Sequence, residues 1–461
     1  MSDPAATGTG DAGLERALGP WSAYALVAGT MIGTGIFFFV SPVATHVASV
    51  PAILAVWIVG TLIATCGAVC VAELAAAYPA TGGIYVFLRE AFGPLVAFLY
   101  AWAYFLIMRV GSIAITVLAF AAFLGELLGL SAQAGTGLSQ AIAITAVVVI
   151  TGVNTIGVGT GGRVQVTLTS LKLLSLAGII VVAAAYAANL VGPHQIELAA
   201  RERPSGDGAW WGFAVALVPV MWTLGGWDES PFVAEEVRDP ERNLPLSVLA
   251  GLWSVGALYV LVNAAYLTVL SPAELAASGS LTATFVLERA LGPTAAGVLT
   301  LALVASTFGA ANGLTLTSAR IAFAAARDHR LLAWLGHAHP HTHAPARALV
   351  VQAALVILAI VTLRDPYDLL LYTAVAYWAF AGMMAAALIV LRRRDPHRPR
   401  PFRVRGYPLV PATFVVAAAC MAFSVARVDL TGLVATVAIL GAGTVVYGLD
   451  LVLRAGRHRR R

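Results

Sequence analysis

Twelve apolar segments, each long enough to cross a bilayer, follow one another along this chain of 461 residues. Only 11% of the residues are charged, whereas soluble domains carry roughly 25%. Lipid offers no partner to backbone N–H and C=O groups, so each segment must close its own hydrogen bonds as a helix. The sequence therefore predicts an all-α polytopic membrane protein. Its twelve transmembrane helices are expected at about 22–47, 51–77, 94–128, 139–157, 163–190, 210–234, 245–270, 293–326, 347–363, 366–391, 407–427 and 430–453.

The arginines indicate how the chain lies across the membrane. With an even number of spans both termini share a side, and most arginines fall on that side. They include the seven between Arg392 and Arg405 and the five between Arg454 and Arg461. Because cytoplasmic loops carry the excess of basic residues, we predict a multi-pass protein of the cell (inner) membrane with both termini cytoplasmic. The basic residues sit at span ends, which argues against a nucleic-acid partner.

Two of the spans contain glycines where a continuous helix is expected. In the first span three glycines interrupt the run Gly29–Phe37, and each costs a helix about 1 kcal/mol relative to alanine. In the sixth span Gly225 and Gly226 form a second interruption. Irregular backbone at membrane depth is tolerated only where it lines a cavity or is buried in protein. Both interruptions therefore indicate a binding site within the membrane.

The interruptions also mark an internal repeat of five spans. Gly33 and Gly225 are 192 residues apart, and the similar entrances to spans 3 and 8, Arg89–Pro94 and Glu288–Pro293, are 199 residues apart. A related hexapeptide at Glu15–Pro20 shows that such Gly-Pro entrances are partly generic. Five is an odd number, so the two halves have opposite orientation. Interrupted spans at matching positions of inverted halves indicate the substrate site of a transporter.

The predicted organisation follows from this repeat. It consists of a cytoplasmic tail at 1–20, a first five-helix repeat at 21–190, a second inverted repeat at 210–391, an Arg-rich cytoplasmic loop at 392–406, two further helices at 407–453 and a basic cytoplasmic tail at 454–461. The tail at 1–20 lacks the basic region of a signal peptide, so we expect the first apolar segment to remain as a span.

Four stretches together resemble the amino acid–polyamine–organocation (APC) superfamily, and most of all its L-type and bacterial amino acid permeases. They are Gly29–Phe37, Thr81–Tyr85, Gly225–Pro245 and Arg398–Pro408. The resemblance implies the LeuT-type fold, in which two inverted five-helix repeats, with discontinuous helices 1 and 6, are followed by two further helices. It also implies transport by alternating access.

A discontinuous helix has unpaired N–H groups at the start of its second half and unpaired C=O groups at the end of its first half. Two such ends that face each other suit a zwitterion, with its carboxylate on the amides and its ammonium on the carbonyls. We therefore predict that an amino acid binds at Thr30, Ile32, Gly33, Thr34 and Gly35 of span 1, at Trp222, Leu224 and Gly225 of span 6, and at Tyr104, Met108 and Ser112 of span 3.

Some of these residues have a structural interpretation as well. The two threonines can bond back to the carbonyl four residues earlier in the helix. The three residues of span 3, spaced four apart, can form a helix-packing face. Trp222 matches the aromatic gate that covers bound substrate in the resembled family, whereas a lone tryptophan in a span is more often a packing residue or an interfacial anchor.

Lys172, the only lysine, lies about nine residues into the fifth span. A charge within a span is costly and marks a functional site by default. In sodium-independent members of the resembled family, a lysine here puts its ammonium where sodium-coupled members bind a cation. This implies a bridge from span 1 to span 8 near Ser306 and Thr307, so we expect Lys172 and Ser306 to act in coupling, without sodium. A snorkelling lysine, the alternative, would have to cover about 13 Å.

Asp228 and Glu229 follow the second interruption closely and are candidates for coupling. A carboxylate at this depth can pair with a cationic substrate side chain or bind a proton. The alternative is a pair that lines water or binds Arg109, which is itself a charge within a span and needs a partner.

The sequence predicts neither a cofactor nor a metal site nor an enzyme. Cys66, Cys70 and Cys420 lie in apolar segments without further metal ligands nearby, and the alternating histidines from His337 to His343 are expected in a solvated cytoplasmic loop. No Ser/His/Asp set recurs at one membrane depth.

The function predicted from these features is sodium-independent secondary transport of amino acids, as a proton symporter or as an exchanger. An alternative within the same fold is a permease or antiporter for cationic amino acids or polyamines, which Asp228 and Glu229 favour. A channel or a non-transporting sensor is the competing class, and the paired interruptions argue against a channel because a continuous pore does not need them. The identity of the amino acid and the oligomeric state stay open.

Overall fold

The computed structural model describes residues 19–79, 82–130, 137–156, 162–192, 209–229, 231, 237–328, 333–335 and 345–458. All elements in these ranges are helical. The first half contains α1 (Pro20–Met31), α2 (Gly35–Phe38), α3 (Val40–His46), α4 (Val50–Ala77), α5 (Ile84–Phe92), α6 (Pro94–Ala103), the π-turn η1 (Tyr104–Met108), α7 (Arg109–Leu127), α8 (Gly137–Ile156) and α9 (Gly162–Ala187). The second half contains α10 (Ala209–Thr223), α11 (Pro240–Val269), α12 (Pro272–Ala277), η3 (Gly279–Leu281), α13 (Thr282–Leu291), α14 (Pro293–Asp328), α15 (Ala346–Leu363), α16 (Pro366–Arg394), α17 (Leu409–Val428) and α18 (Leu430–His458).

The predicted all-α polytopic architecture is confirmed, with one difference at the sixth span. Eleven segments of the described chain are long and apolar enough to cross a membrane, and the sixth is a shorter apolar helix, Trp210–Thr223. It is short because the second interruption follows directly. A tight turn joins spans 9 and 10, and Arg364 in this turn has a φ of 58°. The Asp365 carboxylate caps α16 by accepting from the Tyr367 amide at 2.7 Å.

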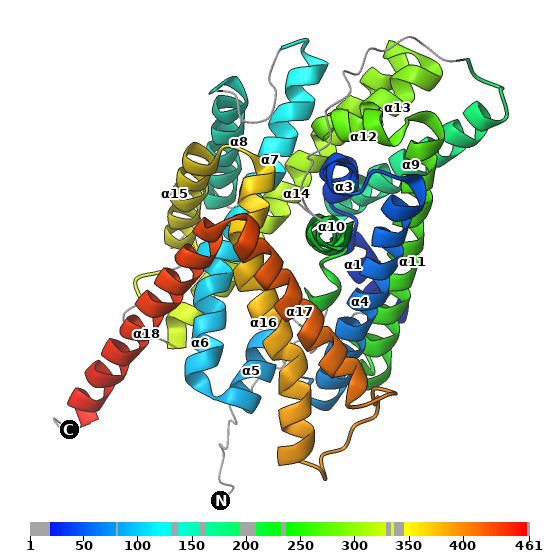
Figure 1. Ribbon diagram of the computed structural model, residues 1–461. Coiled ribbons are helices and arrows are strands. Elements are labelled where there is room, and N and C mark those ends of the chain that lie inside the picture. Colours follow the sequence, from blue (N-terminus) through cyan, green and yellow to red (C-terminus); the bar gives the residue numbers. More distant parts are fainter. Residues whose placement is uncertain are drawn as a thin grey trace, which may run out of the picture.

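The entrances to spans 3 and 8 have the same local structure, as the repeat predicts. The short helices α5 and α13 each end at a glycine with positive φ, 91° at Gly93 and 86° at Gly292. The next helix then begins with a proline at its first position, which suits the fixed φ of that residue. The short helices α5 and α13 lie at opposite ends of the molecule (Figure 1). The two halves therefore run in opposite directions across the membrane.

The second spans of the two halves, α4 and α11, pack along each other. Trp57 of α4 and Tyr259 of α11 meet edge to face there, with ring centroids 5.8 Å apart. Helix α1 packs against the same helix α11. As a result, α11 lies next to the first interruption.

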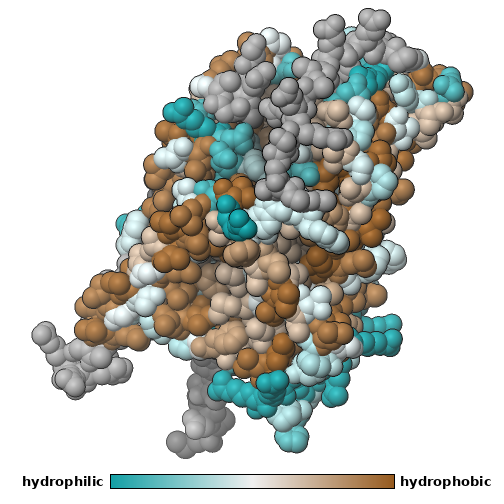
Figure 2. Space-filling model, viewed as in Figure 1, coloured by the Kyte–Doolittle hydropathy of each residue, from teal (hydrophilic) through white to brown (hydrophobic). Residues whose placement is uncertain are grey.

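The connection between α16 and α17 is fixed to the end of α4 by arginines. The fully buried Glu73 carboxylate accepts from Arg392 Nε at 2.7 Å and from the Val404 amide at 2.6 Å, and Arg400 Nε lies 3.5 Å away. Arg398 donates to the carbonyl of the last residue of α4 at 2.8 Å. Figure 2 shows hydrophilic side chains gathered at this lower end, below a broad apolar surface. The arginines that predict the topology thus also fix the connection between α16 and α17 to the end of α4.

At the opposite end, the helices α12 and α13 are tied to α3. The Ser41 hydroxyl of α3 donates to the Ala276 carbonyl at 2.8 Å and accepts from the Gly279 amide at 3.1 Å. Glu274 of α12 pairs with Arg289 of α13 at 2.7 Å. The hydrogen bond from Arg289 lowers the pKa of the Glu274 carboxyl to about 2. These contacts fix α3, in the second half of span 1.

Candidate functional site

The helix of span 1 is broken between Met31 and Gly35. Helix α1 ends at Met31, Ile32 leaves the helical region with ψ at 79°, and the Gly33 amide donates to the Met31 carbonyl at 2.8 Å. The predicted interruption is confirmed, but its start is corrected, because Gly29 lies inside α1. One glycine in a helix interior costs only about 1 kcal/mol and leaves the hydrogen-bond ladder intact.

The break in span 6 lies where the sequence predicts it. Helix α10 ends at Thr223, the Gly225 amide donates to the Trp222 carbonyl at 3.0 Å, and Gly226 has a φ of 102°. Such a φ is accessible to glycine at little cost but is rare for residues with a side chain. The glycine pair therefore ends the helix.

The two breaks are in direct contact. A Cβ on Gly226 would lie 3.0 Å from the Thr30 carbonyl carbon and 3.1 Å from the Met31 nitrogen, so the two backbones touch. The Thr30 hydroxyl donates to the Gly226 carbonyl at 3.2 Å. On the other side of the break, a Cβ on Gly35 would lie 2.5 Å from the Thr223 hydroxyl oxygen. Glycines on both spans thus allow the broken segments to meet.

Three donors from neighbouring helices hold the carbonyls of the first break. The buried Lys172 ammonium of α9 donates to the Ile32 carbonyl at 3.1 Å, and the Tyr259 hydroxyl of α11 donates to the Met31 carbonyl at 2.8 Å. Tyr266, two turns further along α11, reaches the Ile36 carbonyl at 3.5 Å. Lys172 was expected to contact span 1, whereas the two tyrosines were missed. Their spacing of seven residues on a span next to the break is the signal that indicates them.

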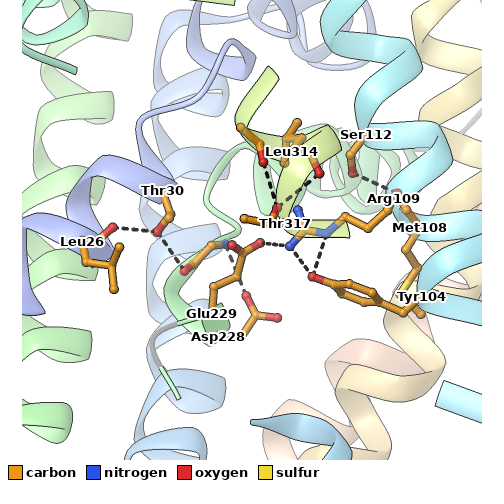
Figure 3. A network of polar contacts seen from close by, with 12 residues as sticks. Leu26, Thr30, Tyr104, Met108, Arg109, Ser112, Asp228, Glu229, Leu314 and Thr317 are labelled. Carbon is orange, nitrogen blue, oxygen red and sulfur yellow. Dashed lines mark hydrogen bonds and ion pairs between the residues drawn. The ribbon is translucent and has the colours of Figure 1, made fainter. Parts of the chain in front are cut away.

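A polar network joins span 3 to the second break (Figure 3). Arg109 Nη2 forms an ion pair with Glu229 at 2.6 Å, and Arg109 Nε donates to the Tyr104 hydroxyl at 2.6 Å. The Asp228 carboxylate accepts from the Gly226 amide at 3.3 Å. The geometry therefore agrees with the interpretation in which Glu229 is the partner of Arg109. A role of Asp228 or Glu229 in coupling stays a prediction.

The spacing assumed for span 3 is corrected by a π-turn. In η1 the Arg109 amide bonds to the Tyr104 carbonyl five residues earlier, so these two residues stack along the helix and their side chains meet. Regular α-helical spacing resumes afterwards, where the Ser112 hydroxyl donates to the Met108 carbonyl at 2.9 Å. Periodicity alone gives no sign of the extra residue in a turn. Substrate contact by Tyr104, Met108 and Ser112 stays a prediction.

Most of the other predicted site residues lie at or beside the breaks. The Thr30 hydroxyl also donates to the Leu26 carbonyl, four residues earlier, at 3.0 Å. Thr30 therefore makes both the bond within its own helix and the contact to span 6. Trp222 meets Phe39 edge to face, with ring centroids 5.1 Å apart, and so links span 6 to span 1. Thr34, Leu224 and, on α14, Ser306 are buried. The gate at Trp222 and the bridge to Ser306 stay predictions.

Comparison with known proteins agrees with this arrangement. A family model described as amino acid permease matches residues 18–447. The chain belongs to the amino acid permease family. This confirms the resemblance drawn from the four sequence stretches.

Three similar proteins illustrate the relationship. The permease is 33% identical to the b(0,+)-type amino acid transporter 1 of Mus musculus over 84% of its own length and 78% of the relative's. It is 32% identical to the Asc-type amino acid transporter 1 of Mus musculus over 87% and 75%. It is 33% identical to the large neutral amino acids transporter small subunit 2 of Oryctolagus cuniculus over 87% and 74%. The last of these is named as a subunit.

The histidines from His337 to His343 lie outside the described residues of the permease. Within the described ranges, no group of three or more His, Cys, Asp or Glu side chains is placed to hold a metal ion. Of the cysteines, the Cys70 thiol donates to the Cys66 carbonyl at 3.1 Å, one turn earlier in α4.

Replacing Gly226 of the permease with alanine is expected to force the two breaks apart. The added Cβ would lie within 3.0–3.1 Å of backbone atoms of Thr30 and Met31, which have no flexible end that can move aside. The φ of 102° adds backbone strain, so we expect a loss of about 1–3 kcal/mol of stability. Thermal unfolding of the purified protein in detergent measures this loss.

The matched control is Gly33→Ala in the other break. There the nearest atom to the new Cβ is the Met31 carbonyl oxygen at 3.9 Å, an ordinary contact. We expect the stability of this variant to stay within about 0.5 kcal/mol of the native protein. Equal unfolding temperatures for the native protein and both variants would contradict the close contact between the breaks.

Proposed function

We propose that this permease carries amino acids across the cell membrane by alternating access, without sodium, as a proton symporter or as an amino-acid exchanger. The observation that carries the proposal is the contact between the two helix breaks at Gly226 and Thr30. Two breaks that meet place backbone amides and carbonyls of opposite polarity around one point. That point suits an α-amino acid, which carries both charges.

The proposed pose follows from the polarity of the helix ends. The substrate carboxylate binds the amides at the start of α2, at Thr34 and Gly35, where the first turn has no intrahelical acceptors, whereas the Gly33 amide already donates to the Met31 carbonyl. The substrate ammonium binds carbonyls at the ends of α1 and α10. The Met31 carbonyl already accepts from the Tyr259 hydroxyl and from the Gly33 amide, and the Ile32 carbonyl accepts from the Lys172 ammonium. The substrate ammonium therefore binds neighbouring carbonyls of these two helix ends. Trp222 covers the substrate as a gate.

Lys172 supports transport without sodium. Its ammonium donates to the Ile32 carbonyl inside the break of span 1, at 3.1 Å. A fixed positive charge on that carbonyl repels a metal cation from the same place and supplies the charge that a bound cation supplies in other transporters. The ammonium can also lose a proton, which offers a link between transport and pH.

A second candidate function is transport of cationic amino acids or polyamines. The Asp228 carboxylate supports it, because this group lies beside the second break and accepts from the Gly226 amide. Glu229 contributes less to this candidate than its charge indicates, since it pairs with Arg109 at 2.6 Å.

The topology proposed with this function puts both termini in the cytoplasm. The Arg-rich connection between α16 and α17 lies at the same end of the molecule as α5 and the end of α18, and this supports the assignment (Figure 1).

Uptake into proteoliposomes tests the proposal. The purified permease is reconstituted with or without internal amino acid, and entry of labelled leucine, alanine, arginine and putrescine is measured with imposed sodium or proton gradients. We expect amino acid uptake that is independent of sodium and is driven by a proton gradient or by internal amino acid. Uptake that requires a sodium gradient would overturn the proposal. Uptake of putrescine in preference to leucine would favour the second candidate.

A further inference from the structure

Glu229, which forms an ion pair with Arg109, lies three residues after Gly226, the glycine at which the two breaks touch. The Arg109 side chain is only 7% exposed, whereas the Glu229 side chain is 32% exposed. Figure 3 shows Glu229 reaching from the end of the second break toward span 3, where Arg109 points to meet it. One partner of the pair is therefore buried in the scaffold, and the other lies partly open beside the break.

Arg109 is held in this place by more than the ion pair. Its Nε donates to the Tyr104 hydroxyl at 2.6 Å, its Nη2 donates to the same oxygen, and its guanidinium lies 4.7 Å from the centroid of the Tyr104 ring. The π-turn brings the two side chains together. A planar guanidinium with several donors can hold Tyr104 and Glu229 at once, whereas a lysine ammonium is a point charge without this geometry.

The charges around the two breaks can be compared one by one. Lys172 bonds to the backbone of the first break, and Arg109 bonds to Glu229. Asp228 bonds to the amide of Gly226, a neutral group. With Arg109 in place, the charge of Glu229 is compensated locally. Without Arg109, the Glu229 carboxylate would be left uncompensated beside the second break.

We infer that Arg109 determines the charge class of the substrate side chain that this permease accepts, by neutralising Glu229. This inference rests on the proposed transport of amino acids at the two breaks. A unit charge several ångströms from a substrate charge changes binding by about tenfold or more at the effective dielectric constant of a protein. Arg109 therefore keeps the site from selecting cationic side chains too strongly, although it does not touch the substrate.

Three variants separate this role from a purely structural one. Glu229→Gln leaves the Arg109 charge without its counterion, Arg109→Gln leaves the Glu229 charge, and the double variant removes both charges while it keeps polar groups of similar size. The apparent inhibition constants of arginine and glutamate against uptake of labelled leucine are measured for each variant in proteoliposomes. The ratio of the two constants reports charge preference and does not depend on the amount of active protein.

The expected shifts have opposite signs. In Glu229→Gln the preference for arginine over glutamate falls at least about tenfold, and in Arg109→Gln it rises at least about tenfold. The double variant returns to within about threefold of the native ratio. If Arg109→Gln cannot be purified in folded form, the comparison of Glu229→Gln with the double variant still decides the matter.

Two outcomes would overturn the inference. One is a ratio that stays constant in Glu229→Gln while leucine is still carried. The other is an equal loss of affinity for all three amino acids, which is the signature of a merely structural ion pair. Failure of the proposed function is distinguishable from both, because the native permease would then carry no amino acid at all.

Discussion

Replacing Lys172 with methionine is expected to reduce amino acid uptake by about ten- to a hundredfold. The Lys172 side chain is buried, and its ammonium donates to the Ile32 carbonyl, inside the break that we propose as the substrate site. A hydrogen bond from a charged donor contributes about 1.5–3 kcal/mol, and each 1.4 kcal/mol is a factor of ten in an equilibrium constant. Methionine keeps an unbranched side chain of similar length, so the helix packing should survive. Initial uptake rates of labelled leucine into proteoliposomes measure the effect.

Two further variants serve as references for Lys172. Leu174→Met introduces the same residue on the same helix, at a side chain that is 69% exposed, and is expected to leave uptake unchanged. Tyr259→Phe removes a neutral hydrogen bond to the neighbouring Met31 carbonyl, and such a bond contributes only about 1 kcal/mol. Its effect should therefore be smaller than that of Lys172→Met. Native uptake by Lys172→Met would contradict a role for the ammonium.

Replacing Glu73 with glutamine is expected to destabilise the protein by about 3–5 kcal/mol, the usual cost of breaking a buried ion pair. The carboxylate is fully buried and binds Arg392, Arg400 and the Val404 amide at the end of α4. The variant leaves the two guanidinium groups without a counterion, and an amide cannot accept on both of its ends. We expect a clear fall in the unfolding temperature in detergent.

The exposed pair of Arg89 and Glu90 provides the matched control. These side chains are 48% and 42% exposed and lie 3.2 Å apart. Glu90→Gln makes the same chemical change, but an exposed pair contributes only about 0–1 kcal/mol. Similar unfolding temperatures for the two variants would show that the connection between α16 and α17 does not depend on Glu73.

The general architecture could be read from the sequence because it depends on local composition. Apolar segments of spanning length, glycines at the two breaks and the matching entrances at Gly93 and Gly292 each act within a few residues. Their physical causes, the cost of an unpaired backbone group in lipid and the conformational freedom of glycine, need no knowledge of distant contacts. The sequence therefore indicated the helices, the repeat and the approximate location of the breaks.

The partners of the charged groups could not be read in the same way. Arg109 was recognised as a charge that needs a partner, but the sequence left open whether Asp228 or Glu229 binds it. The π-turn at Tyr104–Met108 changes which side chains of span 3 meet, and the pattern of residues gives no sign of it. The arginines near Arg392 indicated orientation, whereas their bonds to Glu73 depend on how α4, α16 and α17 end together.

By itself, the sequence determined that this is a broken-helix membrane protein with two inverted halves, and it predicted a substrate site at the breaks. The tertiary structure decided which atoms of that site are already occupied: the Ile32 carbonyl by Lys172, the Met31 carbonyl by Tyr259 and the Glu229 carboxylate by Arg109. The reason is that hydropathy and glycine act along the chain, whereas a hydrogen bond between spans depends on the rotation and depth of each helix. Those two quantities are fixed only when all the spans pack together.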